Sequence, residues 1–286
     1  MNSLKVGTAT FEWGKRTYLM GIVNVTPDSF SGDGVLDTVK AIQQGIQMEK
    51  DGADIVDVGG ESTRPGSVPL SLEEELARVI PVIKGLSKGT RVPISIDTYK
   101  AEVARQAIEA GASMVNDVWG GRMDSELLKV AARANIPIIL MHNRSQPKNA
   151  EQTEKLGGRY VGMEYKNLLV DIKKELQESI DAALAAGVSR ENIIVDPGIG
   201  FGKTVEQNLE LVHRLGELEE LGYPILVGPS RKSFVGYTLD LPPEERLEGT
   251  AAAVTLCIDR GADIVRVHDV ARMRRVTKLT DAVVRR

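Results

Sequence analysis

Short apolar segments alternate with longer amphipathic segments along nearly the whole chain. The apolar segments are rich in Val and Ile and end in polar residues, as short buried strands do. They predict eight strands, at 18–24, 54–58, 93–97, 113–116, 136–142, 192–196, 224–228 and 263–267. The amphipathic segments predict helices at 37–50, 71–88, 99–109, 124–134, 162–186, 205–221, 244–260 and 268–283.

One phrase recurs where these strands begin. "DGADIVDVGG", "AGASMVNDVWG" and "RGADIVRVHD" each join a helix end, a glycine turn and a short strand. Strict alternation of strand and helix indicates parallel strands with crossover helices, and eight such units in about 250 residues are typical of a (β/α)8 TIM barrel. An open, doubly wound α/β sheet has the same local pattern and is the alternative.

Residues 4–16 alternate around Gly7 and Gly14 and predict a short N-terminal β-hairpin, which in a barrel would cover the N-terminal mouth. Neither a linker nor a low-complexity segment interrupts the pattern, so we expect residues 1–286 to form a single domain.

Composition and charge restrict the class of protein. The net charge of −4 over 286 residues gives no electrostatic reason to expect nucleic acid or an anionic membrane as partner. No apolar stretch approaches the ~18 residues of a membrane-spanning helix, and the first residues lack the apolar core of a signal peptide. The single Cys257 excludes an internal disulfide and fits a reducing compartment. We therefore expect a cytoplasmic protein.

The stretch "DPGIGFGKT", residues 196–204, has the composition of a nucleotide-binding loop without its spacing. A P-loop requires glycine where this chain has Pro197, and the glycines do not follow the G-x-G-x-x-G spacing of a dinucleotide site. We interpret it as a loop that follows a strand, in which Asp196 carries the chemistry and Phe201 offers a ring for stacking. Lys203 is expected to begin the next helix.

Polar residues stand at or just beyond the ends of all eight predicted strands: Asn24, Asp57, Asp97, Asn116, His142, Asp196, Ser230, Arg266 and His268. In a barrel they would point into the C-terminal mouth, where active sites are built. Any one of them could instead cap the following helix, and this alternative is favoured for Asp57 and His142. Their occurrence at every strand end favours an active site.

The residue types suggest what this site binds. Arg266 and His268 are two residues apart and therefore face the same side, where they suit a phosphate or diphosphate. Lys232 adds positive charge in the loop region where barrels often hold phosphate. Of Asp97 and Asp196, one could accept two N–H groups from a guanidine-like edge, such as a pterin or purine carries, and the other could stabilise positive charge in a transition state.

Seven segments, in order along the chain, resemble the dihydropteroate synthases, a family of pterin-binding barrels of the folate pathway that sulfonamides target. They are "GIVNVTPDSFSGDG", "DIVDVGGESTRPG", "ISIDTYK", "GASMVNDVWGG", "IIVDPGIGFGKT", "ILVGPSRKSF" and "IVRVHDV". The resemblance implies condensation of 6-hydroxymethyl-7,8-dihydropterin diphosphate with p-aminobenzoate, giving 7,8-dihydropteroate and diphosphate, with Mg²⁺ as cofactor. It also implies a homodimer.

The resemblance assigns roles to residues of this chain. The implied pterin pocket contains Asp97, Asn116, Asp196 and Lys232. Asn24 would bind Mg²⁺ and diphosphate, and Arg266 and His268 would clamp the diphosphate. The implied p-aminobenzoate pocket contains Phe30, Thr63, Arg64, Pro65, Phe201 and Ser230. Catalysis is expected to rest on Asp97, Lys232, Arg266 and His268.

Two other functions are consistent with parts of the pattern. A methyltransferase of the same family, acting on methyltetrahydrofolate, would retain the pterin carboxylates but has no use for the "STRPG" and "SRKS" loops, both of which are present. A barrel that only binds pterin would be expected to lack Arg266, His268 or Lys232, and none is missing. The segments 144–165 and 236–246 are expected to be surface loops.

Overall fold

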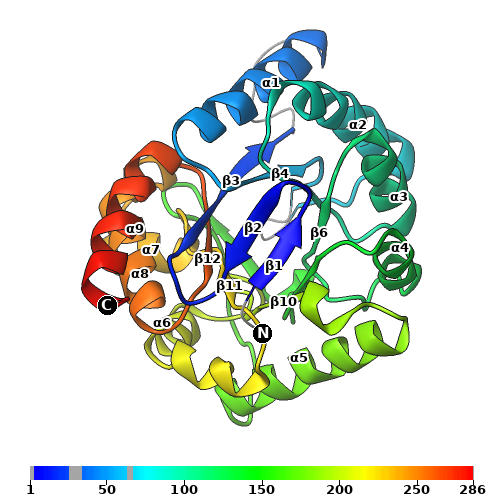
Figure 1. The fold of residues 1–286 in the computed structure, drawn as a ribbon. Helices are drawn as coiled ribbons and strands as arrows, with labels where there is room; N and C mark the ends of the chain where they lie inside the picture. The colour runs from blue at the N-terminus through cyan, green and yellow to red at the C-terminus, as the bar shows by residue number, and fades with distance from the viewer. Residues whose placement is uncertain (1–2, 26–33, 63–66, 286) are drawn as a thin grey trace.

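Eight parallel strands form a ring inside an outer ring of helices in the computed structural model, which describes residues 3–25, 34–62 and 67–285 (Figure 1). The strands are β3 Tyr18–Asn24, β4 Ile55–Gly59, β5 Ile94–Asp97, β6 Met114–Asp117, β7 Ile138–Met141, β10 Ile193–Asp196, β11 Leu226–Val227 and β12 Ile264–Val267. They pair in the order β10-β7-β6-β5-β4-β3-β12-β11, and a bridge between Val195 and Ile225 joins the two ends. The predicted TIM barrel is confirmed, and the open sheet is wrong.

Helices cover the outside of this ring. They are α1 Gly34–Lys50, α2 Leu72–Gly89, α3 Ala101–Ala110, α4 Glu126–Ala134, α5 Leu168–Ala185, α6 Val205–His213, α7 Ser233–Leu239, α8 Leu247–Asp259 and α9 Val270–Val284. Local sequence sets several ends: Ser71 caps α2 in a capping box with Glu74, and Gly111 ends α3 in the left-handed conformation. Short 3-10 turns lie at η2 Pro147–Asn149, η3 Arg190–Asn192, η4 Leu215–Leu221 and η5 Pro243–Glu245.

The predicted N-terminal hairpin is confirmed and closes one end of the barrel. It consists of β1 Ser3–Val6 and β2 Ala9–Glu12, and Figure 1 shows it lying across the centre of the ring. Its buried residues Leu4, Val6 and Phe11 form one cluster with inward-facing strand residues: Tyr18, Met20, Ile55, Met114, Ile139, Ile194, Leu226 and Ile264. This end of the barrel is therefore a packed apolar layer.

Two segments expected to be loops contain regular structure: the end of α7 and the 3-10 turn η5 lie within 236–246, and a hairpin lies within 144–165. Within 144–165, β8 Ala150–Thr153 pairs with β9 Gly157–Tyr160, and the following helix begins only at Leu168, after the cap Asn167. This β8–β9 hairpin packs on α7, where Arg159 lies over the ring of Tyr237. Polar strand residues without an apolar face gave no periodic signal for the hairpin.

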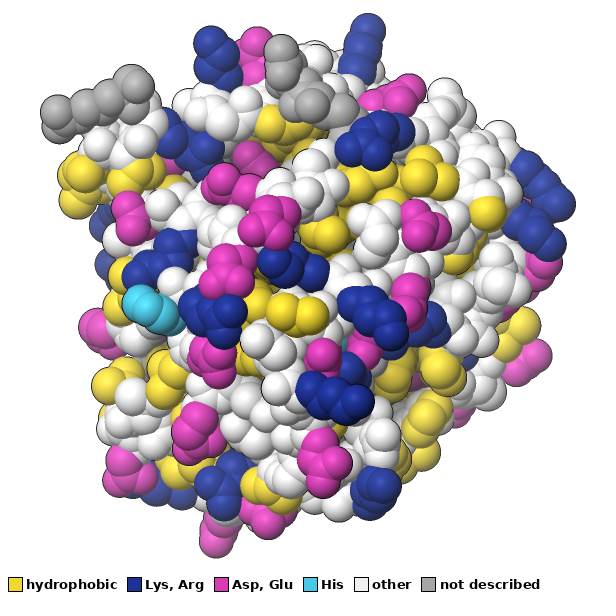
Figure 2. Space-filling view, turned by 90° about the horizontal axis from the view of Figure 1, so that it is seen from below, with side chains coloured by type: hydrophobic (Ala, Val, Ile, Leu, Met, Phe, Trp, Pro, Cys, Tyr) yellow, Lys and Arg dark blue, Asp and Glu magenta, His cyan; other side chains and the backbone are white. Residues whose placement is uncertain are grey.

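Neither the described helices nor the face drawn in Figure 2 suggests contact with a membrane or a polyanion. Among the described residues, every helix is too short or too polar to cross a bilayer. On the face shown in Figure 2, Lys and Arg side chains are interspersed with Asp and Glu side chains.

Candidate active site

A polar layer lies directly above the apolar layer of the barrel interior. Because side chains alternate along a strand, the residue two positions after an inward apolar residue also points inward. The sequence follows this rule on four strands, with Asp57 after Ile55, Asn116 after Met114, Asp196 after Ile194 and Arg266 after Ile264. On β5 the corresponding residue is Asp97. The C-terminal mouth predicted from the strand ends therefore collects these side chains.

Arg266 lies at the centre of this layer between two carboxylates. Its Nε donates to Asp57 Oδ2 and its Nη2 donates to Asp97 Oδ2, each at 2.6 Å. Asn116 Nδ2 donates to the same Asp57 oxygen at 3.0 Å. Asp57, fully buried, is thus the anchor of Arg266 and not simply the end of a strand, and its place two residues after Ile55 was the signal that could have identified it.

Burial governs the protonation of these groups. It raises the pKa of Asp97, with Asp57 and Glu75 acting in the same direction and Arg266 and Lys232 opposing them. Burial also raises the pKa of Asp196 to about 6, although the hydrogen bond from the Gly198 N–H and the charge of Lys232 both act to lower it. At neutral pH Asp196 is therefore a carboxylate that a change of pH can readily neutralise.

The glycine-rich loop after β10 is shaped around Asp196. Asp196 Oδ1 accepts a hydrogen bond from Gly198 N at 2.7 Å. Gly198 has φ +71°, and a Cβ there would lie 1.9 Å from the carbonyl oxygen of His142. Only glycine fits this position, so the glycines serve the turn and the close approach of two backbones, as expected for a loop that is not a P-loop.

One side of the mouth is apolar. Phe201 packs with Val118 and Met141, and the Lys232 Nζ lies 3.8 Å from the centre of the Phe201 ring. Phe201 was expected from the sequence, whereas Val118 and Met141 were not. Met141 follows inward-facing Ile139 by two residues, which was the available signal.

The loops after β11 and β12 are tied together. Ser230 Oγ lies 3.0 Å from His268 Nδ1, and Arg231 pairs with Asp269 through contacts of 2.9 and 2.7 Å. Burial lowers the pKa of His268 to about 3, assisted by Arg266, so the ring is neutral at pH 7. Arg231 has φ +56°, a strained conformation for a side chain with a Cβ, and it lies between Ser230 and Lys232. These contacts fix the position of His268, one of the two residues expected to bind diphosphate.

Three interpretations made from the sequence are wrong or fall outside the structure. His142 does not point into the mouth; it packs outward, against Glu175 of α5 and Lys203. Lys203 does not begin the next helix, because Thr204 is the cap of α6 and Lys203 is buried behind the glycine-rich loop. The predicted residues Phe30, Thr63, Arg64 and Pro65 lie outside the described residues.

Asn24 is the predicted metal ligand and ends β3 at the same edge of the barrel. It is half-buried and pairs in register with Gly59, whose neighbour on β5 is Asp97. Within the described ranges, no three His, Cys, Asp or Glu side chains are grouped so as to hold a metal ion. Mg²⁺ is commonly held by one or two protein oxygens together with waters and substrate phosphates, so the amide oxygen of Asn24 is a ligand of the kind that this ion accepts.

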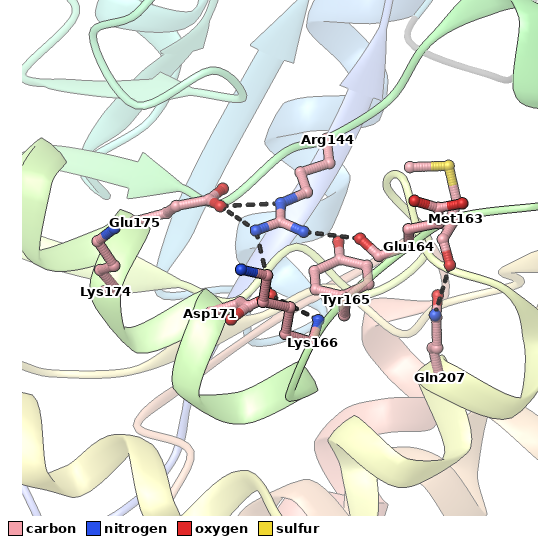
Figure 3. Close-up of a pocket in the computed structure, with 9 residues that line it drawn as sticks. All are labelled: Arg144, Met163, Glu164, Tyr165, Lys166, Asp171, Lys174, Glu175 and Gln207. Atoms are coloured by element: carbon pink, nitrogen blue, oxygen red, sulfur yellow. Dashed lines mark hydrogen bonds and ion pairs between the residues drawn. The ribbon is translucent and has the colours of Figure 1, made fainter.

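A hollow of about 750 Å³ lies outside the mouth, beside the starts of α5 and α6 (Figure 3). Its lining is charged and internally paired: Arg144 contacts Glu175 and Asp171, and its guanidinium lies 4.3 Å from the ring centre of Tyr165. None of the predicted site residues that the structure describes lines this hollow.

Comparisons with known proteins agree with this geometry. The family model described as pterin binding enzyme matches residues 20–268. The dihydropteroate synthase of Clostridium beijerinckii is 52% identical over 285 residues, covering 99% of this chain and all of that protein. A structure of the Clostridium difficile enzyme with pteroic acid has a TM-score of 0.89 at 48% identity, covering 96% of this chain and 100% of that one. The Xanthomonas albilineans enzyme with 4-aminobenzoic acid has a TM-score of 0.88 at 40% identity, covering 99% and 98%.

Proposed function

We propose that this chain, which belongs to the family of pterin-binding enzymes, acts as a single domain that catalyses the dihydropteroate synthase reaction. The observation that carries the proposal is the composition of one mouth: the carboxylates Asp97 and Asp196 lie with the cations Lys232 and Arg266 at the same strand ends. A ligand with a guanidine-like ring edge and a diphosphate group requires this combination. The names of the relatives favour the synthase over a methyltransferase or a barrel that only binds pterin.

The pterin is proposed to bind on the carboxylate side of the mouth. Asp196 accepts from the exocyclic amine and the adjacent ring N–H, a paired contact that a carboxylate can make with its two oxygens. Asn116 and Lys232 donate to the ring acceptors, and Asp97 lies beside the ring. The pterin therefore presents its methylene carbon towards Arg266.

The diphosphate is proposed to bind between Arg266 and His268. Arg266 is held by Asp57 and Asp97, so its guanidinium is oriented before substrate arrives and supplies charge without reorganising. Mg²⁺ bound at Asn24 would add positive charge at the phosphate oxygens. Together these groups stabilise diphosphate as the leaving group.

The reaction then joins the two substrates. The bond between the pterin methylene carbon and the diphosphate oxygen breaks, its electron pair leaves with diphosphate, and the aniline nitrogen of p-aminobenzoate bonds to the carbon and loses a proton to solvent. Asp97 offsets the positive charge that develops on the pterin. Phe201, with Val118 and Met141, provides an apolar wall for the aminobenzoate ring. Ser230, Phe30, Thr63, Arg64 and Pro65 are proposed to complete that pocket.

The test compares wild type with Lys232→Ala. Dihydropteroate and diphosphate are measured with pterin diphosphate, Mg²⁺ and p-aminobenzoate, and Lys174→Ala, an exposed substitution on α5, is the control. Product from wild type and the control, with a loss of at least about 100-fold in Lys232→Ala, supports the proposal. Binding of pterin by wild type without any product would refute it.

We also propose a homodimer and a cytoplasmic location. Exposed apolar side chains on neighbouring helices, Leu256 on α8 and Leu279 and Val283 on α9, support an association surface, and sedimentation of Leu279→Glu against wild type tests it. The free, buried Cys257 is consistent with a reducing compartment.

A further inference from the structure

Lys203 is a buried cation behind the glycine-rich loop, on the side away from the mouth. Its side chain is 2% exposed. Its Nζ contacts three acceptors, the carbonyl oxygens of Gly198 and Phe201 and the Nδ1 of His142, each at 3.0 Å. An ammonium group has three N–H donors and no acceptor, so these contacts use all of its hydrogen-bonding capacity.

The contact with Lys203 determines the tautomer of His142. If Nδ1 accepts from Lys203, the ring hydrogen is on Nε2, which lies 3.0 Å from Glu175 Oε2, although this contact is not aligned as a regular hydrogen bond. Burial, assisted by Lys203, lowers the pKa of His142 to about 3, so the ring is neutral. Neutral His142 is thus an acceptor for the cation and lies against a carboxylate.

Glu175 connects this buried arrangement to the hollow in Figure 3. Arg144 binds the Glu175 carboxylate, and the figure shows both at the wall of the hollow. Burial tends to raise the pKa of Glu175, but His142 and Arg144 together lower it to about 2. A continuous series of polar contacts therefore runs from Arg144 through Glu175 and His142 to Lys203.

The other side of the loop faces the substrates. Gly198, whose carbonyl accepts from Lys203, donates its N–H to Asp196. Phe201, whose carbonyl also accepts from Lys203, lies under the ammonium of Lys232. The orientations of Asp196 and Phe201 thus depend on carbonyl groups that Lys203 holds.

We propose that Lys203 is a positioning residue for both substrates: as a cation, held by neutral His142 and supported by Glu175, it fixes the loop that presents Asp196 to the pterin and Phe201 to p-aminobenzoate. This inference rests on the proposed function. Lys203 touches neither substrate and acts through the loop.

Protonation of Lys203 then couples the loop to pH. Burial is the largest influence on the pKa of Lys203 and lowers it to about 7. Asp196 and Glu175 favour the charged form of Lys203, and Arg144 and Arg122 oppose it. A neutral amine has two N–H donors for three acceptors, so one support of the loop is lost. Above pH 7, where Asp196 is already ionised, pterin affinity is therefore expected to decline as the pH rises to 9.

The experiment uses Lys203→Met, which keeps the length of the side chain and removes its charge and donors. Its matched control is Lys174→Met, on α5 at the hollow but 76% exposed. Binding of pteroic acid is measured by calorimetry at pH 6 to 9, with kcat and KM for both substrates and the melting temperature of each variant. We expect Lys203→Met to weaken pteroic acid binding at pH 6 by about 10- to 100-fold and to raise the KM for both substrates. Above pH 7, the affinity of this variant for pteroic acid should not depend on pH. Affinity and pH dependence like those of wild type would overturn the inference.

Glu175→Gln provides a second test if Lys203→Met does not fold. It removes a negative charge that favours protonated Lys203 and leaves every residue of the loop in place, so the midpoint of the pH dependence should move to lower pH. An unchanged midpoint would contradict the inference. Failure of the proposed function itself is distinguishable, because wild type would then form no dihydropteroate at any pH.

Discussion

Asp57→Asn tests how the barrel interior holds Arg266. The substitution preserves size and removes the charge from a fully buried side chain whose Oδ2 accepts from Arg266 and Asn116. Removing one partner of a buried ion pair costs about 3–5 kcal/mol. Asp97 still accepts from Arg266, so we expect the cost to be closer to that of one charged hydrogen bond, about 2 kcal/mol.

This loss should be visible in two measurements. A destabilisation of about 2 kcal/mol corresponds to a fall of about 4–8 °C in melting temperature for a protein near this size. Calorimetry should also show weaker binding of pyrophosphate with Mg²⁺, because Arg266 is no longer fixed from both sides. Glu102→Gln breaks the exposed Glu102–Arg105 pair on α3 and serves as control, since exposed pairs contribute little. Stability and pyrophosphate affinity equal to those of the control would refute the role given to Asp57.

Three further predictions concern the loop after β10 and the metal. Gly198→Ala should abolish pteroic acid binding, because it combines about 1–2 kcal/mol of left-handed strain with a clash against the carbonyl oxygen of His142. Gly157→Ala is the control: Gly157 also has a positive φ but open space around it, so this variant should bind pteroic acid normally. Asp196, with its pKa raised from 3.8 to about 6, should make pteroic acid binding weaken as pH falls through 6. Unfolding free energy should show the opposite trend: the contribution of Asp196 is present below pH 4 and lost as pH rises through 6, and the difference between wild type and Asp196→Asn isolates it. Chelation by EDTA should stop dihydropteroate formation while pteroic acid still binds, and Asn24→Ala should raise the Mg²⁺ concentration that restores activity; loss of pteroic acid binding on chelation would contradict this assignment.

Much of the site could be predicted because alternation along a strand is a strictly local property. Asn116, Asp196 and Arg266 follow apolar inward residues by two positions, and each lies in the mouth. The same rule excludes His142, since the inward residues of β7 are Ile139 and Met141. Grouping polar residues by their nearness to a strand end, without regard to which face they occupy, produced this error.

The remaining features depend on contacts between segments far apart in the sequence. Lys203 is buried only because the chain near His142 and α5 closes over it, and no spacing near Lys203 indicates this. The β8–β9 hairpin packs against α7, and its turn is held by buried Arg246, which donates to Leu156 O at 2.9 Å. Local patterns contain no information about such partners.

The stacking of a polar layer on an apolar layer makes the length of each strand as important as its composition. Deleting one residue between Ile55 and Asp57 would turn Asp57 towards the helices and bring an outward-facing side chain into the mouth. Point substitutions in the upper layer change chemistry while the hairpin-sealed lower layer still supports the fold, whereas a single insertion or deletion within a strand disturbs both layers at once. Mutant libraries that vary residue identity at the strand ends and keep the strand lengths constant would therefore sample new activities while the barrel fold is retained.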